Sequence, residues 1–392
     1  MAVSASFGRC RMQSTIRTQT ARLSSSNTRN ESTIHADSTL ATRARRQPRA
    51  PRPPSDYSQV LQSAQSLNLM KRAYGYYALR IALLAGGLAG VWVAFAFVGN
   101  SWAQMAVAAA LGIVLTQIIF YSHDAAHRQI FQSQKANEMT ALVMGTLIGG
   151  VSLAWWHNKH NKHHAAPNQI GKDSDIDASV VHFYPPARPP QNRILSYLHQ
   201  RQGWWFYPIL SFEMLNLHVQ GVQALLTRRK MKRRWTEIAM LVVRLGGYPA
   251  LLFSVLPAGK AAAFLGVQLI VTGLYLGGSF AASHIGMPVL PHDSRIDFLR
   301  RQVLTSRNIS GGRVASFAMG GLNYQIEHHL FPSMPRPNLH KMVPVVQNFC
   351  ANNSIDYHEV NILKAWHIVG VHLNKVGLSA RSFQCPMVAS MR

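Results

Sequence analysis

Residues 103–127 read AQMAVAAALGIVLTQIIFYSHDAAH, a long apolar run followed by two histidines. The uncharged part, residues 103–121, is long enough as a helix to cross most of the ~30 Å hydrocarbon layer of a membrane. His123 and His127 come directly after it, and positions i and i+4 share one face of a helix. The stretch therefore predicts a membrane span that presents two imidazoles at one membrane surface.

Four further apolar runs occur along the chain, at residues 81–98, 139–156, 236–256 and 261–283. Short links join 81–98 to the run described above and 236–256 to 261–283, which predicts two helical hairpins, 81–121 and 236–283. The remaining run is rich in glycine and ends in Trp155 and Trp156, as expected of a re-entrant or interfacial helix. We therefore expect an all-α integral membrane protein with four spans in two hairpins. Five true spans are the alternative.

The chain is strongly basic, with 40 Lys+Arg against 15 Asp+Glu among 392 residues. The basic residues collect after residue 121, around residues 157–235 and after residue 284, whereas the two hairpin turns carry a single lysine. The positive-inside rule then places the basic segments and the histidines among them on the cytoplasmic side. A nucleic-acid-binding protein would present its basic residues on a soluble domain, so we exclude that class and expect membrane lipid as a partner.

Residues 1–55 differ in composition from the rest of the chain. They contain ten Arg, no Lys and only two acidic residues, Glu31 and Asp37. This composition predicts a disordered basic tail, with a targeting segment as the alternative. We expect residues 56–377 to form the membrane domain and residues 378–392 to form a C-terminal tail.

Eight histidines lie just beyond the apolar runs, at one predicted membrane face: His123, His127, His160, His163, His164, His284, His328 and His329. Protonated imidazoles at such spacings would repel one another, whereas neutral imidazoles are common metal ligands. Eight ligands exceed the roughly four to six that one metal ion accepts, so two ions are expected. Zinc with four nitrogen ligands would form a closed structural site. Iron accepts more imidazoles and keeps positions open for oxygen chemistry.

The motifs H-x3-H, H-x2-HH and Q-x2-HH, in this order and between paired spans, resemble the membrane fatty-acid desaturase superfamily. The phrases GGLNYQIEHHLFP and GKDSDID resemble its front-end or linoleoyl-CoA-type branch, which includes bacterial acyl-CoA desaturases. The resemblance covers about residues 56–377. It implies a cytosolic helical cap that holds a histidine-ligated, non-haem di-iron centre, with O2 as co-substrate and a long-chain acyl substrate.

The resemblance also implies roles for single residues. The eight histidines would be the iron ligands, although Ser283 precedes His284 where relatives often have Asn. Gln325 stands where other branches have His, so it would either ligate iron weakly or hydrogen-bond a ligand. Side chains expected to support the ligands are Gln325, Asp124, Asn161, Asp173, Asp175 and Glu327. His157 lies outside the family's pattern, and we expect it either at the surface or beside the ligands.

The haem-binding motif HPGG, common in front-end desaturases, does not occur in this sequence. We therefore expect NAD(P)H electrons to arrive through a separate redox protein: a ferredoxin, a cytochrome b5-type protein or an oxidoreductase. We favour a bacterial-type plasma membrane, with the endoplasmic reticulum and plastid membranes as alternatives. A hydroxylase on the same scaffold is the alternative activity. A metal transporter is disfavoured because its ligands would lie within the spans.

Overall fold

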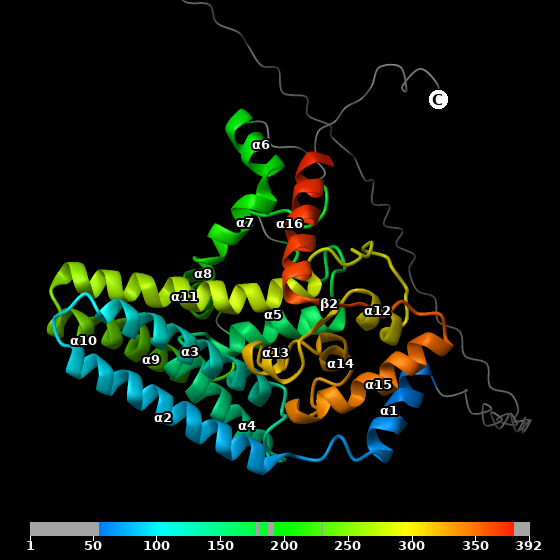
Figure 1. Cartoon of the computed structure of the whole chain (residues 1–392), viewed down its shortest axis with the longest axis horizontal. Coiled ribbons are helices and arrows are strands. Elements are labelled where there is room, and N and C mark those ends of the chain that lie inside the picture. The colour runs from blue at the N-terminus through cyan, green and yellow to red at the C-terminus, as the bar shows by residue number, and fades with distance from the viewer. Residues whose placement is uncertain (1–54, 178–179, 187–191, 229, 380–392) are drawn as a thin grey trace, which may run out of the picture. The chain divides into compact units, whose positions relative to one another are not determined.

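Four long apolar helices organise the part of the chain that the computed structural model describes, which is residues 55–177, 180–186, 192–228 and 230–379 (Figure 1). They are α2 (Tyr74–Val98), α3 (Gln104–Ala126), the run of α9 (Arg234–Val242), η2 (Val243–Gly247) and α10 (Tyr248–Val255), and α11 (Ala258–His284). Each is long and apolar enough to cross a membrane. The prediction of four candidate spans is therefore confirmed.

All four helices extend beyond the predicted apolar runs at one end or at both. α3 continues past residue 121, so that His123 lies in its last turn, and α11 ends at His284. Ser122 and Asp124, the polar residues near the end of α3, have partners inside the protein. Ser122 Oγ donates to the Ala141 carbonyl at 3.0 Å, and Asp124 pairs with Arg336 at 2.8 Å. Hydropathy marks only the uncharged part of each helix, because it does not detect such partners.

Both hairpin turns lie at the same end of this helix layer. Gln104, at the start of α3, donates to the Phe95 and Gly99 carbonyls at 2.8 and 2.9 Å and closes the first turn. Lys260, in the second hairpin, donates to the Asn100 carbonyl and side chain at 2.9 and 2.7 Å. Because the turns are tied together, the histidine-bearing ends of α3 and α11 meet at the opposite end.

The run 139–156 is divided between two helices. α4 (Gln134–Ala141) continues into η1 (Leu142–Ile148), and the chain then turns by 112° into α5 (Leu153–Ala165). Gly150 has φ +79°, a left-handed conformation that glycine adopts at little cost. The Ser152 hydroxyl accepts the Trp155 N–H and begins α5.

Two polar side chains hold this bend. Arg244, from η2, donates through Nε to the Ile148 carbonyl at 2.7 Å. His218 Nδ1 lies 2.8 Å from the Gly150 carbonyl oxygen. A helix pair bent in this way is either a re-entrant loop or a broken span, so the re-entrant interpretation stays a prediction.

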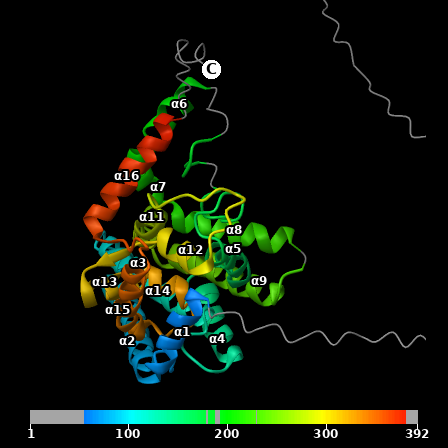
Figure 2. The same ribbon diagram turned by 90° about the vertical axis from the view of Figure 1, so that its right-hand side faces the viewer.

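Short helices cover the histidine-bearing end of the layer, which Figure 2 views directly. They are α1 (Asp56–Ser66), α12 (Phe298–Leu304), α13 (Gly312–Ala318), α14 (Gln325–Leu330) and α15 (Arg336–Asn352). Leu299, Ile326, Leu330 and Met342 are buried in one core between α1, α12, α14 and α15. This core holds α14, which carries His328 and His329, against the ends of the long helices.

A second group of helices lies beside α11: α6 (Arg193–Gln200), α7 (Gln202–Leu210), α8 (Glu213–Thr227) and α16 (Ile362–Ser379). α16 packs along α6 and α7 in both views (Figures 1 and 2). Its last two residues overlap the predicted tail 378–392. The predicted basic tail, residues 1–55, lies outside the described residues except for Ser55, as does 380–392.

The sequence predicted an all-α chain, but the structure also contains two short strands. Strands β1 (Asn308–Ser310) and β2 (Glu359–Asn361) form a two-stranded parallel sheet. Ile309 pairs with Val360 at its centre, and both residues are β-branched. The strands are too short for any periodic signal in the sequence. Their effect is to fix the segment that precedes α14.

Candidate metal centre

The eight predicted histidines converge in two adjacent groups. His123, His127, His160, His164 and His328 form the five-histidine group, in which the nearest ring nitrogens all lie within 4.8 Å of one another. His163, His284 and His329 form the three-histidine group by the same criterion. The rings of His164 and His329 stack at 4.3 Å, so the two groups lie side by side.

Helix geometry explains how neighbouring residues reach different groups. Successive residues on an α-helix point about 100° apart, so His328 serves one group and His329 the other. In α5, His160 and His164 are one turn apart and share the five-histidine group. His163 points to the three-histidine group. The second and third motifs therefore each supply both groups.

The ring nitrogens that face each other cannot satisfy one another. His123, His127 and His164 place their Nε2 atoms 3.2, 2.8 and 3.0 Å from His160 Nε2. A neutral ring nitrogen offers either one N–H or one lone pair, so it can serve only one of these three neighbours. Within the part of the chain that the structure describes, the buried Nε2 atom of His328 has no hydrogen-bond partner. A cation among these nitrogens would satisfy them together.

In the three-histidine group, the far side of each ring is already engaged. His163 Nδ1 lies 2.9 Å from Asp173 Oδ2, His284 Nδ1 lies 3.1 Å from the Thr305 carbonyl, and His329 Nδ1 lies 2.9 Å from Gln302 Oε1. Each acceptor requires the proton to be on Nδ1, which leaves the Nε2 lone pair free. Metal-binding histidines are held in this way.

Three histidines outside the long helices, His127, His328 and His329, are held neutral. Burial lowers the pKa of His127, His328 and His329 well below its usual range, and neighbouring histidines lower it further. An imidazole with a lowered pKa is unprotonated at neutral pH. Its lone pair is then available to a metal without the loss of a proton.

Most of the predicted supporting residues lie beside the histidines. Asp173 and Asp175 lie 2.9 and 3.4 Å from His163 Nδ1, and Asp124 lies 3.8 Å from His123 Nδ1. Gln325 Nε2 lies 2.8 Å from His284 Nε2, while its Oε1 is buried without a partner. Gln325 therefore adds a fourth polar side chain to the three-histidine group.

Glu327 supports the site through the backbone rather than through a histidine. Its carboxylate accepts hydrogen bonds from Asn308 Nδ2 at 2.7 Å and Tyr357 Oη at 2.9 Å. Burial raises the pKa of Glu327 to about 7, although these two hydrogen bonds lower it. Asn308 Oδ1 also accepts the Ile326 N–H at 3.0 Å. This network ties α14 to β1.

Two predicted supporting residues lie apart from both groups. Asn161 is exposed, and no described hydrogen bond links it to a histidine. It precedes the lysine of HNKHH on the exposed face of α5, and its supporting role stays a prediction. His157 packs against Trp156 with ring centroids 5.6 Å apart and belongs to neither group.

Sequence reasoning did not identify three residues that position the histidines. Gln302 accepts from His329 Nδ1 and donates to the His164 carbonyl at 3.1 Å, so it braces both groups. Trp156 stacks on His160 at 4.2 Å. Arg336 binds the Asp124 carboxylate and donates to the Phe120 carbonyl at 2.9 Å, which fixes the last turn of α3. Gln302 and Arg336 carry no motif, because only the folded chain brings them to the site.

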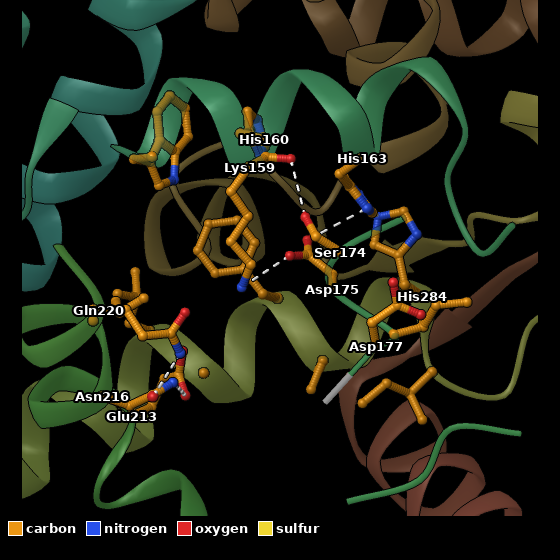
Figure 3. Close-up of a pocket in the computed structure, with 18 of the residues that line it drawn as sticks. Lys159, His160, His163, Ser174, Asp175, Asp177, Glu213, Asn216, Gln220 and His284 are labelled. Carbon is orange, nitrogen blue, oxygen red and sulfur yellow. Dashed lines mark hydrogen bonds and ion pairs between the residues drawn. The ribbon is translucent and has the colours of Figure 1, made fainter. Parts of the chain in front are cut away.

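A cavity of about 760 Å³ reaches both groups. His123 and His160 of the five-histidine group and His163 and His284 of the three-histidine group line it. Its other lining residues are mostly apolar, among them Ile119, Phe120, Trp156, Leu276 and Phe280. Figure 3 shows the polar part of its wall, where Lys159 pairs with Asp175 at 3.0 Å.

Replacing Asp173 by alanine tests the support of His163. Asp173 Oδ2 also accepts the Asn168 N–H at 2.8 Å. The variant therefore removes a hydrogen-bond partner from the His163 ring and another from the backbone at Asn168. Losses of this kind typically cost about 10–100-fold in metal affinity or activity. We expect a loss of this size in product per protein and reduced iron content. Asp293→Ala, an exposed acidic residue, is the matched control. Unchanged iron content and activity in Asp173→Ala would contradict the assignment.

Comparison with known proteins agrees with this geometry. The family model for fatty acid desaturases matches residues 100–361. An acyl-lipid (9-3)-desaturase of Physcomitrium patens is 33% identical over 279 residues, which is 66% of this chain and 51% of that protein. The chain thus spans about half the length of that relative.

Two further relatives carry similar names. The delta(8)-fatty-acid desaturase 1 of Arabidopsis thaliana is 25% identical over 358 residues, 86% of this chain and 77% of that protein. A delta(5) fatty acid desaturase of Caenorhabditis elegans is 30% identical over 260 residues, 63% of this chain and 58% of that protein.

Proposed function

Because the chain belongs to the fatty acid desaturase family, we propose that it catalyses the oxygen-dependent desaturation of a long-chain fatty acyl substrate at a histidine-ligated di-iron centre. Two neighbouring C–H bonds of the acyl chain break and a C=C bond forms. O2 takes up the two hydrogens together with two electrons and two protons, and two water molecules result. When bound, the two iron ions would supply the oxygen chemistry that removes both hydrogens.

The main support for the proposal is the cavity beside the histidines. It is largely apolar, as an acyl chain requires, and histidines from both groups are part of its wall. Trp156 and Phe280 line it beside His123 and His160. An acyl chain held between these aromatic rings would have its methylene groups next to both groups of ligands while water is excluded.

Expression of the chain in a host with a known lipid composition tests this proposal. Fatty-acid profiling with double-bond location should reveal a new unsaturated product that depends on His160. A hydroxylated product in place of the alkene would favour the hydroxylase on the same scaffold. Cells with iron-loaded protein and no new fatty acid of either kind would refute the proposal.

We further propose that the metal centre faces the cytoplasm and that both hairpin turns face the opposite side. The turns carry one lysine between them, Lys260, and basic residues are concentrated at the other end. We propose that NAD(P)H electrons reach the site through a separate redox protein. The same basic surface is suited to an acidic donor of this kind.

A single cysteine in the first turn tests the topology. Ser101 lies between α2 and α3 and is exposed. In a parent in which Cys10 and Cys385 are replaced by serine, Ser101→Cys should react with a membrane-impermeant thiol reagent applied to intact cells. The parent retains Cys350, which is buried, so labelling of the parent measures the background. Labelling only after permeabilisation would invert the proposed orientation.

A further inference from the structure

We propose that Glu237 and Arg244, two charged side chains inside the span formed by α9, η2 and α10, are positioning residues for the metal centre. They hold the break between η1 and α5 from its two sides. α5 carries His160, His163 and His164, which serve both histidine groups. The inference rests on the metal centre of the proposed function and adds two residues that act on it through the backbone of the bend.

Both charged side chains face the protein rather than the lipid. Glu237 in α9 is 1% exposed, and Arg244 in η2 is 8% exposed. Val242 and Val243, which lie between them, are 65% and 59% exposed, as expected of side chains that contact lipid. Glu237 and Arg244 are seven residues apart (244 − 237), about two helical turns, so they reach the same side of the span. Charged residues within spans are costly and usually have a function.

Glu237 holds the start of α5. Its Oε2 atom accepts the Ser152 hydroxyl at 2.6 Å, and its Oε1 atom accepts the Ala154 N–H at 3.0 Å. Ser152 Oγ in turn accepts the Trp155 N–H at 3.3 Å. The first N–H groups of a helix have no partner within the helix, and the first turn attracts negative charge. The carboxyl group therefore fixes the first turn of α5 at two neighbouring points of the chain.

Arg244 holds the end of η1. Its Nε atom donates to the Ile148 carbonyl at 2.7 Å, and its guanidinium group lies 4.1 Å from the centre of the Tyr248 ring. The last carbonyls of a helix lack partners within it and attract positive charge. His218 of α8 adds a third contact, since its Nδ1 lies 2.8 Å from the Gly150 carbonyl oxygen. The two opposite charges of one span thus meet the opposite ends of the two helices at the break.

The bend acts on the reacting centre in two ways. His160 follows Ser152 by eight residues (160 − 152), about 12 Å along α5. A tilt of about 5° at the bend would move His160 by about 1 Å, more than the roughly 0.5 Å that a set of functional side chains tolerates. Gly145, Val151 and Trp155, on both sides of the bend, line the cavity. The bend therefore sets the positions of three ligands and the shape of the wall beside them.

Cobalt(II) loading measures the ligand geometry without turnover, because the visible absorption of cobalt(II) depends on the number and arrangement of its ligands. In the intact purified chain, Glu237→Ala should still bind two cobalt ions but with shifted or weakened bands. The iron-loaded variant should lose about 10–100-fold in turnover. Glu237→Gln should keep the wild-type bands, because its amide can accept the Ala154 N–H and donate to Ser152 Oγ. Thr236→Val, an exposed neighbour in the same turn, is the matched control.

A purely structural role of Glu237 predicts a different result. Glu237→Ala would then melt at a lower temperature while its folded fraction kept the wild-type cobalt bands, and this outcome would overturn the proposal. If Glu237→Ala does not fold, Ser152→Ala decides, because it removes the 2.6 Å contact from the other side; unchanged bands in this variant would also overturn the proposal. Shifted bands, together with no new fatty acid from the iron-loaded wild-type chain, would support the positioning role and refute the proposed function alone.

A double-variant cycle tests whether the two charges act on one bend. Arg244→Met removes the donor to the Ile148 carbonyl and keeps an unbranched side chain. If both residues act through the same bend, the losses of turnover in Glu237→Ala and Arg244→Met should not multiply in the double variant. Losses that multiply would show independent effects and overturn the shared role.

Discussion

Replacing His328 by alanine is expected to abolish measurable desaturation. The His328 ring lies 4.8–4.9 Å from the rings of His123, His127 and His164. Its Nε2 atom is buried and has no hydrogen-bond partner among the described residues, so it is placed to bind a metal ion. A methyl group cannot supply a lone pair. Because four histidines of the group remain, we expect much of the iron to stay bound while turnover is lost.

The measurement is product per iron-loaded protein, with expression and iron content determined for each variant. His358→Ala is the matched control, because its side chain is exposed and only its backbone carbonyl has a structural role, accepting the Asn308 N–H at 2.9 Å. This control should retain full activity. Near-normal turnover of His328→Ala would show that the five-histidine group is not the reacting centre.

The sequence predicted much of this arrangement because its signals are local. Uncharged runs of span length and histidines at helical spacing are visible within a few residues of each other, and the order of three motifs identified the superfamily. That resemblance is confirmed by the family match over residues 100–361. The assignment to a bacterial acyl-CoA branch stays a prediction.

What the sequence could not predict depends on contacts between distant segments. His328 and His329 reach different groups because of the orientation of α14. That orientation is set by the hydrophobic core against which α14 packs and by the hydrogen bond from the Ile326 N–H to Asn308 Oδ1. Gln302 reaches His329 across 27 residues, and Arg336 reaches Asp124 across more than two hundred. No periodicity encodes such pairs.

The last prediction concerns the three-histidine group, which has fewer ligands to lose. His284→Ala leaves two histidines there, so we expect iron to fall from two ions per chain toward one and desaturation to disappear. The structure gives His284 a fixed orientation, because Nδ1 lies 3.1 Å from the Thr305 carbonyl and Nε2 lies 3.3 Å from His163 Nε2. The five-histidine group should keep its metal.

Gln325 should respond differently from His284. Its amide nitrogen meets the His284 Nε2 lone pair at 2.8 Å, but a bound metal would take that lone pair. The amide would then turn, and its oxygen, which is buried without a partner among the described residues, could serve as a weak ligand or accept a hydrogen bond from a ligand. Gln325→Ala should therefore cost about 10–100-fold, as losses of supporting contacts do, and Gln325→His should keep metal and part of the activity. If Gln325→Ala lost all turnover while both irons remained, the amide would have to act on the reacting groups themselves.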